Sequence, residues 1–195
     1  VGSVSAELLA ERGAKIVAVT TAHGGVYNDK GLDIPGLVAF AQRREPLDRF
    51  GGGEAITNAD LFKLKVDVLV PAAIENQITV ENQAGIQAAV IVEGANGPVT
   101  PDADNLLHAR GIFIVPDILA NSGGVTASYF EWVQDRYGYF WPEQDVVSRL
   151  EATMSRAFDA VLKTSLTHKV DLRTAAYILA IDRVATVTRM RGMYA

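Results

Sequence analysis

The sequence contains no cysteine, which excludes disulfide bonds and thiolate chemistry, both for metal binding and for catalysis. Its three histidines stand far apart, at positions 23, 108 and 168, and their spacing matches neither a metal site nor a catalytic triad. No apolar run approaches the roughly 20 residues that a membrane-spanning helix needs, and no secretory signal pattern is visible. We therefore expect a cytoplasmic protein with no metal and no membrane partner.

Clusters of basic residues are also missing. The chain has 18 Lys and Arg against 23 Asp and Glu, a net charge of -5, and its basic residues are scattered. A nucleic-acid-binding surface concentrates positive charge, so we expect no nucleic-acid partner. What is present is an ordinary globular composition: 195 residues, 49% hydrophobic and 21% charged, enough to build a packed core.

Short apolar runs alternate with segments of helical periodicity. The runs, each typical of a buried strand, lie at 16–19, 66–70, 89–92 and 112–115. Apolar spacing and capping residues predict helices at 3–12, 36–44, from 57, 79–88, 100–111, 145–168 and 172–191, with loops at 20–31 and 45–54. The predicted N-terminal residues of four of these helices are Thr57, Thr79, Thr100 and Asp171. This alternation predicts an α/β fold: a Rossmann-like, doubly wound, mostly parallel sheet with helices on both faces, followed by long C-terminal helices.

Ligands of such sheets bind beyond the carboxyl ends of the strands. Gly2, at the start of the first helix, would suit the end of a glycine-rich phosphate loop. The run at 16–19 leads into Thr20 and Thr21, where a carboxylate commonly binds the adenosine ribose. Thr21 would not repel a 2′-phosphate, and His23 is close enough in sequence to meet one. The choice between NAD and NADP therefore stays open.

Amide and hydroxyl side chains follow the later strands. Asn96 lies between two glycines in residues 93–98, and Asn121 follows the run at 112–115. A carboxamide matches both the donor and the acceptor of another amide, so these two side chains would suit a nicotinamide ring and its ribose. Ser128 comes seven residues after Asn121, about two helical turns on. We expect one helix to carry both residues on the same side, so that the Ser128 hydroxyl could bind a substrate carboxylate.

Five segments together resemble the glutamate dehydrogenase family, which includes leucine, phenylalanine and valine dehydrogenases. They are residues 71–78, 93–98, 116–125, 128–132 and 173–180. The resemblance covers essentially the whole chain. It implies NAD- or NADP-dependent oxidative deamination of L-glutamate to 2-oxoglutarate and ammonia, by a homohexamer.

The resemblance also implies a role for each matching position. Gly2 becomes the tail of a glycine-rich loop. Cofactor contacts are implied for Gly2, Thr21, Ala72, Ala73, Asn76, Asn96 and Asn121, and substrate contacts for Val125 and Ser128. Within this set, Ala72, Ala73 and Asn76 match the adenosine side, and Thr21 departs from the family's usual aspartate. The family's catalytic lysines and aspartate match no position in this chain.

The chain starts at Val1 without a methionine and enters a helical pattern at once, which indicates a piece of a longer protein. The implied division is a dinucleotide-binding domain at 1–136, lacking its first strand and the start of its glycine-rich loop, and C-terminal helices at 137–195 that pack toward a substrate domain. The isolated chain is expected to be inactive. Two alternatives stay open: a non-catalytic regulatory subunit, which Thr21 favours, and a sister dehydrogenase for an apolar amino acid, which Ser128 disfavours.

Overall fold

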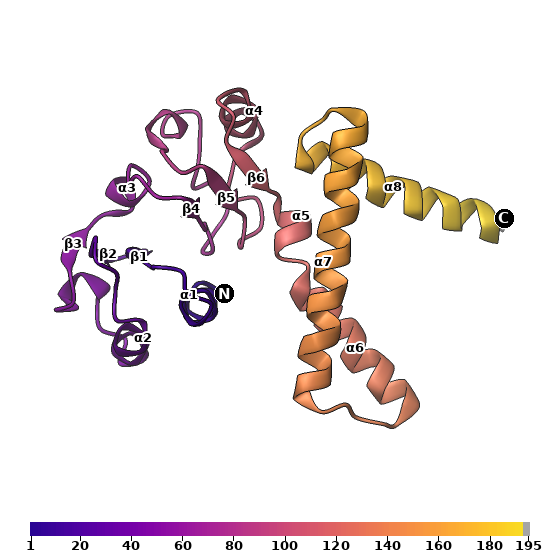
Figure 1. Cartoon of the computed structure of the whole chain (residues 1–195), viewed down its shortest axis with the longest axis horizontal. Coiled ribbons are helices and arrows are strands. Elements are labelled where there is room, and N and C mark those ends of the chain that lie inside the picture. The colour runs from indigo at the N-terminus through magenta and orange to yellow at the C-terminus, as the bar shows by residue number, and fades with distance from the viewer. Residues whose placement is uncertain (193–195) are drawn as a thin grey trace. The chain divides into compact units, whose positions relative to one another are not determined.

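The computed structural model describes residues 1–192. It divides the chain into two compact units, Val1–Ile112 and Phe113–Ala195, which Figure 1 follows from the indigo N-terminus to the yellow C-terminus. The predicted functional division at 136/137 lies within the second unit and stays a prediction.

The first half of unit 1 is a small antiparallel sheet with helices beside it. Its elements are α1 (Gly2–Glu11), β1 (Ala18–Thr21), β2 (Gly24–Tyr27), α2 (Ile34–Gln42), the 3₁₀ turn η1 (Leu47–Arg49) and β3 (Glu54–Ile56). β1 pairs antiparallel with β2, and β2 with β3, in the order β1-β2-β3 (Figure 1). Loops had been predicted where β2 and the start of β3 lie. The prediction of one mostly parallel sheet is therefore wrong for this part of the chain.

The reason for the hairpin is its turn. Thr21 pairs with Gly24 across two connecting residues, and Gly24 has φ +104°, which suits glycine. Two-residue connections are the commonest way to join antiparallel strands. The sheet packs on a cluster of five buried side chains: Val26, Ile34, Leu37, Phe40 and Leu47.

The second half of unit 1 contains the predicted parallel pairing. Its elements are α3 (Asn58–Leu61), β4 (Val68–Leu69), the 3₁₀ turn η2 (Gln83–Gly85), β5 (Val90–Val92) and α4 (Pro101–Ala109). β4 and β5 pair in parallel, with Val68 opposite Val90. The predicted helix starts are confirmed for two helices: Thr57 and Asp60 form a reciprocal capping box on α3, and Pro101 opens α4. The Thr100 side chain makes no capping hydrogen bond.

The helix predicted at 79–88 does not form, and η2 is its helical remnant. Asn82 explains the difference. Its side chain accepts a hydrogen bond from the Thr79 amide at 2.8 Å and donates one to the Gln77 carbonyl at 2.8 Å. These local bonds offer the backbone an alternative to a helical ladder.

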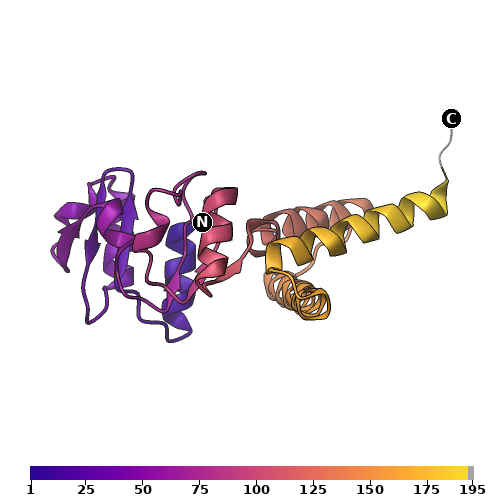
Figure 2. The ribbon, with the colours of Figure 1, turned by 90° about the horizontal axis from the view of Figure 1, so that it is seen from above.

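Unit 2, as far as residue 192, is helical apart from one strand. Its elements are β6 (Phe113–Val115), α5 (Asp117–Ala120), α6 (Gly123–Tyr137), α7 (Glu143–His168) and α8 (Leu172–Arg191), and Figure 2 shows α8 as a long yellow helix. Lys169 closes α7 in a left-handed conformation, and the Asp171 carboxylate caps α8 by accepting from the Thr174 amide, as predicted. No helix within residues 1–192 is long and apolar enough to cross a membrane.

Candidate functional site

Two strand-end loops of unit 1 are joined into one surface, which we call the paired-loop wall (residues 71–76 and 93–98). The Gly94 and Ala95 amides both donate to the Pro71 carbonyl at 3.0 Å, and the Asn76 amide donates to the Gly97 carbonyl at 2.9 Å. Backbone bonds at both ends fix the two loops against each other. The wall therefore brings together Ala72, Ala73, Asn76 and Asn96, which the sequence analysis had assigned separately.

Small residues keep one side of the wall flat beside the start of α1. A Cβ placed on Gly2 would lie 3.7 Å from the Ala72 Cβ. A Cβ placed on Gly94 would lie 3.2 Å from the Ala72 Cβ and 3.5 Å from Val1 Cγ1. Gly2, Ala72 and Gly94 thus lie next to each other, although 92 positions separate the first from the last in the sequence.

The first turn of α1 is open to an anion. No side chain caps it, and it contains no acidic residue. Unsatisfied amides and the helix dipole favour negative charge at such an end, and the adjoining glycine and alanine surface lets a ligand approach the backbone closely. These features fit the pyrophosphate of a dinucleotide.

The polar side chains of the wall are exposed. Ala73, Asn76 and Asn96 are all open to solvent. Asn76 has a left-handed backbone conformation with φ 54°, and Gly97, next to Asn96, has φ 52°. These sharp turns place the side-chain amides of Asn76 and Asn96 at the surface. A bound ligand can reach them without rearrangement of the core.

Glu93, at the base of the wall, was missed by the sequence analysis. Its side chain is fully buried, and among the described residues no buried side-chain nitrogen or oxygen lacks a hydrogen-bond partner. A carboxylate is costly to bury unless it is bonded. The signal in the sequence was an acidic residue directly after an apolar strand.

Thr21 is exposed at the end of β1. Its hydroxyl donates to the Gly24 carbonyl at 3.2 Å and accepts from the His23 amide at 3.3 Å, while the Asn58 side chain donates to the Thr21 carbonyl at 3.1 Å. Thr21 is therefore held between the hairpin turn and α3. Asn58 comes from 37 residues away, and no local pattern could have indicated this contact.

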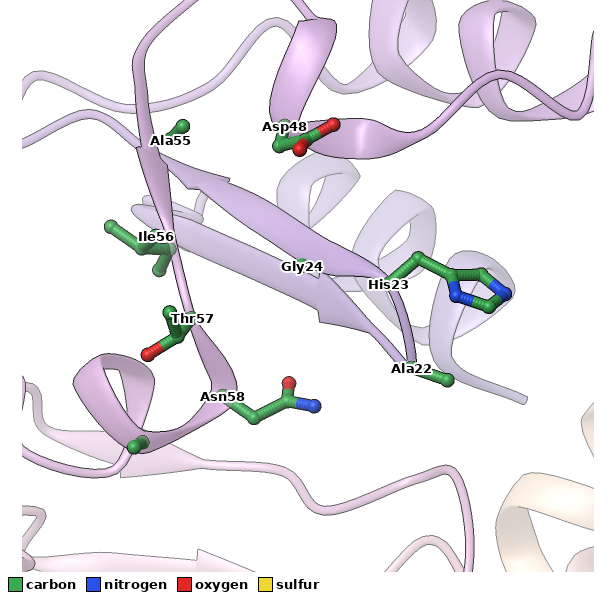
Figure 3. A pocket seen from close by; sticks show the side chains of 9 residues that line it. Ala22, His23, Gly24, Asp48, Ala55, Ile56, Thr57 and Asn58 are labelled. Carbon is green, nitrogen blue, oxygen red and sulfur yellow. The ribbon is translucent and has the colours of Figure 1, made fainter.

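A shallow hollow of about 520 Å³ adjoins Thr21 (Figure 3). It is lined by Ala22, His23, Gly24, Asp48, Ala55, Ile56, Thr57, Asn58 and Ala59. The His23 imidazole projects outward from the hairpin turn (Figure 3). Asp48 lies beside Gly24, since a Cβ placed on Gly24 would be 3.6 Å from the Asp48 Cβ. His23 and Asp48 thus both border the hollow, and the predicted contact of His23 with a 2′-phosphate stays a prediction.

The α3 capping box holds the rim of this hollow. The Thr57 hydroxyl donates to the Asp60 carboxylate at 2.6 Å, and the Thr57 amide donates to it at 3.0 Å. The hydroxyl bond, followed by the amide bond, lowers the pKa of Asp60 from its ordinary value of 3.8.

The remaining predicted residues lie in unit 2. Asn121 is half-buried and lies directly after α5, as its C-terminal cap. Its backbone amide donates to the Asp117 carbonyl at 3.0 Å. Val125 and Ser128 lie on α6 and are exposed. The expectation that one helix carries Asn121 and Ser128 is wrong. The backbone leaves the helix at 121–122 and starts again at Gly123, because Ser122 turns its hydroxyl back to the Leu119 carbonyl at 2.8 Å.

Metal ligands do not gather anywhere in the described residues 1–192: no group of three or more His, Asp or Glu side chains could hold an ion. Five of the predicted contact residues carry amide or hydroxyl groups, which bind an organic ligand by hydrogen bonds: Thr21, Asn76, Asn96, Asn121 and Ser128.

A family model for glutamate/leucine/phenylalanine/valine dehydrogenase matches residues 1–192. The chain belongs to this family. Over its full length it is 51% identical to the glutamate dehydrogenase of Thermotoga maritima, and the match covers 47% of that protein. Over 98% of its length it is 46% identical to the catabolic NAD-specific glutamate dehydrogenase of Bacillus subtilis, and the match covers 45% of that protein.

The solved structures agree with the sequence relatives. The hetero-hexameric glutamate dehydrogenase from Thermus thermophilus, in its Leu-bound form, matches the whole chain with a TM-score of 0.93 and 35% identity, and 46% of that protein's chain is covered. The α/β fold is therefore that of these dehydrogenases. The chain spans about half the length of the relatives that it matches.

Proposed function

We propose that the chain forms the cofactor-binding part of an NAD(P)-dependent glutamate dehydrogenase, which converts L-glutamate to 2-oxoglutarate and ammonia. The observation that carries this proposal is the 51% identity to a glutamate dehydrogenase across all 195 residues. The paired-loop wall supports it, because the motifs behind the resemblance assemble into one surface beside the open end of α1.

Each part of unit 1 then has a task in holding the dinucleotide. The first amides of α1 bind the pyrophosphate. Ala72, Ala73 and Asn76 face the adenosine side, and Asn96 hydrogen-bonds the ribose or carboxamide of the nicotinamide half. The bound dinucleotide supplies the acceptor for the hydride that leaves the substrate carbon.

The residues of unit 2 orient the reacting groups. Asn121 faces the nicotinamide, while Val125 and Ser128 contact the substrate side chain, with the Ser128 hydroxyl donating to its carboxylate. No residue of this chain is assigned as the general acid or base. We therefore expect no turnover of glutamate by the isolated 195 residues, and an assay with glutamate and NAD or NADP measures this directly.

The preferred cofactor is NAD, for which the Bacillus subtilis relative is specific. Thr21 weakens the discrimination against NADP, because no carboxylate stands at that position to repel a 2′-phosphate. In a fluorescence titration, the Thr21→Asp variant should lose affinity for NADPH by about tenfold or more while its affinity for NADH is kept. Equal effects on both cofactors would contradict this role of Thr21.

A chimaera tests the enzymatic function. In the Thermotoga maritima enzyme, the matching 47% of the protein is replaced by this chain, and glutamate-dependent reduction of NAD is measured. Activity with glutamate above that with leucine is the expected result. The same chimaera carrying Asn96→Ala, a substitution at an exposed wall residue, should show a raised KM for the cofactor.

A regulatory subunit is the second candidate. A structural relative is a hetero-hexamer, which contains more than one kind of subunit, and Thr21 departs from the carboxylate typical of a dinucleotide site. This candidate predicts a folded, assembled chimaera that lacks activity with glutamate. A sister dehydrogenase instead predicts higher activity with leucine. Assembly into a hexamer is proposed for all three readings.

A further inference from the structure

Helix α5 is too short to hold its own position. It has four residues, Asp117–Ala120, and an isolated helix of one turn is unstable because nucleation fixes several residues for few hydrogen bonds. Yet α5 is followed directly by Asn121, its C-terminal cap, which the proposed function places at the nicotinamide. Its position must come from the helices that pack against it within unit 2.

Part of that support is apolar. Leu119 is 6% exposed and belongs to a cluster with Val161 of α7 and with Leu172, Ala175 and Ala176 of α8. This contact buries one face of α5, but a leucine packed among aliphatic side chains does not fix the rotation of a single turn as a directional bond does.

The directional support comes from Arg173. Its Nη1 lies 3.2 Å from Asp117 Oδ1, and the two side chains are 23% and 22% exposed. Asp117 Oδ1 also accepts the Ile118 amide at 2.8 Å, and the Asp117 carbonyl accepts the Asn121 amide at 3.0 Å. One residue of α5 is therefore bonded to α8 through its side chain and to Asn121 through its backbone.

We infer that Arg173 is a positioning residue: by holding Asp117, it fixes the turn that presents Asn121 to the nicotinamide. The role of Asn121 in this inference rests on the proposed function, and the link between the three residues rests on their hydrogen bonds and ion pair. Arg173 itself touches neither cofactor nor substrate in this scheme. A charge-assisted bond at a partly buried site is strong enough to define the geometry of one turn.

The experiment compares Arg173→Met with Arg183→Met in the full chain. Both arginines lie on α8, and Arg183 is exposed ten residues further along. The first readout is hydrogen exchange of the Asn121 amide, with the Thr126 amide, bonded to the Ser122 carbonyl at 3.1 Å, as an internal reference. The second readout is the dissociation constant of NADH and of ADP-ribose, which lacks the nicotinamide.

Arg173→Met should accelerate exchange at Asn121 relative to Thr126. It should weaken NADH on the order of tenfold and leave ADP-ribose within about twofold. Arg183→Met should change neither quantity, and Arg173→Lys should restore part of the NADH affinity. If Arg173→Met fails to fold, Asp117→Asn removes the ionic partner and is measured in its place.

Unchanged exchange at Asn121 in a folded Arg173→Met or Asp117→Asn chain overturns the inference, as does an equal loss of affinity for NADH and ADP-ribose. Failure of the unaltered chain to bind either molecule overturns the proposed function and the cofactor role of Asn121 together. The exchange measurement then still decides whether Arg173 fixes the turn.

Discussion

Gly94, in the paired-loop wall, has little room for a side chain. A Cβ at this residue would lie 3.2 Å from the Ala72 Cβ and 3.5 Å from Val1 Cγ1. Two carbon atoms reach their optimal separation at about 3.5–4.0 Å, so Gly94→Ala compresses the first contact by a few tenths of an ångström. Neither the Ala72 Cβ nor the backbone behind it can rotate away.

The compression must therefore displace the loop at Ala72. That loop is held by the Pro71 carbonyl, which accepts from the Gly94 and Ala95 amides at 3.0 Å each. Overpacking of this kind costs about 1–3 kcal/mol. For a chain of this size, each kcal/mol lowers the melting temperature by about 2–4 °C.

Differential scanning calorimetry of Gly94→Ala measures this loss. The matched control is Gly51→Ala in the same unit, since nothing lies within 4 Å of a Cβ at Gly51. That variant should be neutral or slightly more stable, because alanine restricts the unfolded chain. Equal melting temperatures for the two variants would refute the close contact. In the same proteins, NADH should bind more weakly to Gly94→Ala than to Gly51→Ala.

Three further predictions concern unit 1. Gly97 has φ 52°, and no atom lies within 4 Å of a Cβ placed on it. Gly97→Ala should therefore lower the free energy of unfolding by about 1–2 kcal/mol through backbone strain alone, and Gly97→Asn should lower it less. Denaturant titration measures both, and equal losses would argue against left-handed strain. Leu107 is fully buried, so Leu107→Ala should lower the free energy of unfolding by about 2–5 kcal/mol. In the same titration Leu106→Ala should lower it much less, because Leu106 is 41% exposed. The Thr57 hydroxyl and amide lower the pKa of Asp60. The ionised carboxylate therefore stabilises the fold fully above pH 3.8, its ordinary pKa, and this stabilisation fades as the pH falls through the lowered pKa. The difference in unfolding free energy between the natural chain and Asp60→Asn should narrow over that acidic range, and a constant difference would contradict the assignment.

Local chemistry in the sequence predicted the helices that carry their own signals. Thr57 and Asp171 were predicted as caps, and both side chains accept the expected backbone amides. A capping residue and its partner lie within three positions of each other, so the pattern is complete in a short stretch of sequence. The same locality explains the error at 79–88, where the hydroxyl of Thr79 suggested a cap, while Asn82 bonds the backbone in a competing arrangement.

Pairing between strands was harder to predict, because its partners are distant or depend on turn geometry. The run at 16–19 looks like a buried parallel strand, yet the β1 strand continues to Thr21 and turns back into β2. A glycine-containing segment is compatible with either a loop or a hairpin. The choice depends on β3, which arrives 27 positions after the end of β2 and completes the sheet.

The candidate site combines both cases. Asn76, Asn96 and Asn121 could be recognised from their sequence motifs, but what holds them is remote: the wall joins residues about 20 positions apart, and the Asn121 turn is bonded through Asp117 to Arg173, 56 positions further on. Each of these amides lies in a segment with little regular structure of its own. Their geometry is consequently set by backbone carbonyls, small residues and one ion pair that motif recognition does not weigh. Substitutions at Gly94 and Arg173 should therefore disturb ligand binding although neither residue is assigned a ligand contact.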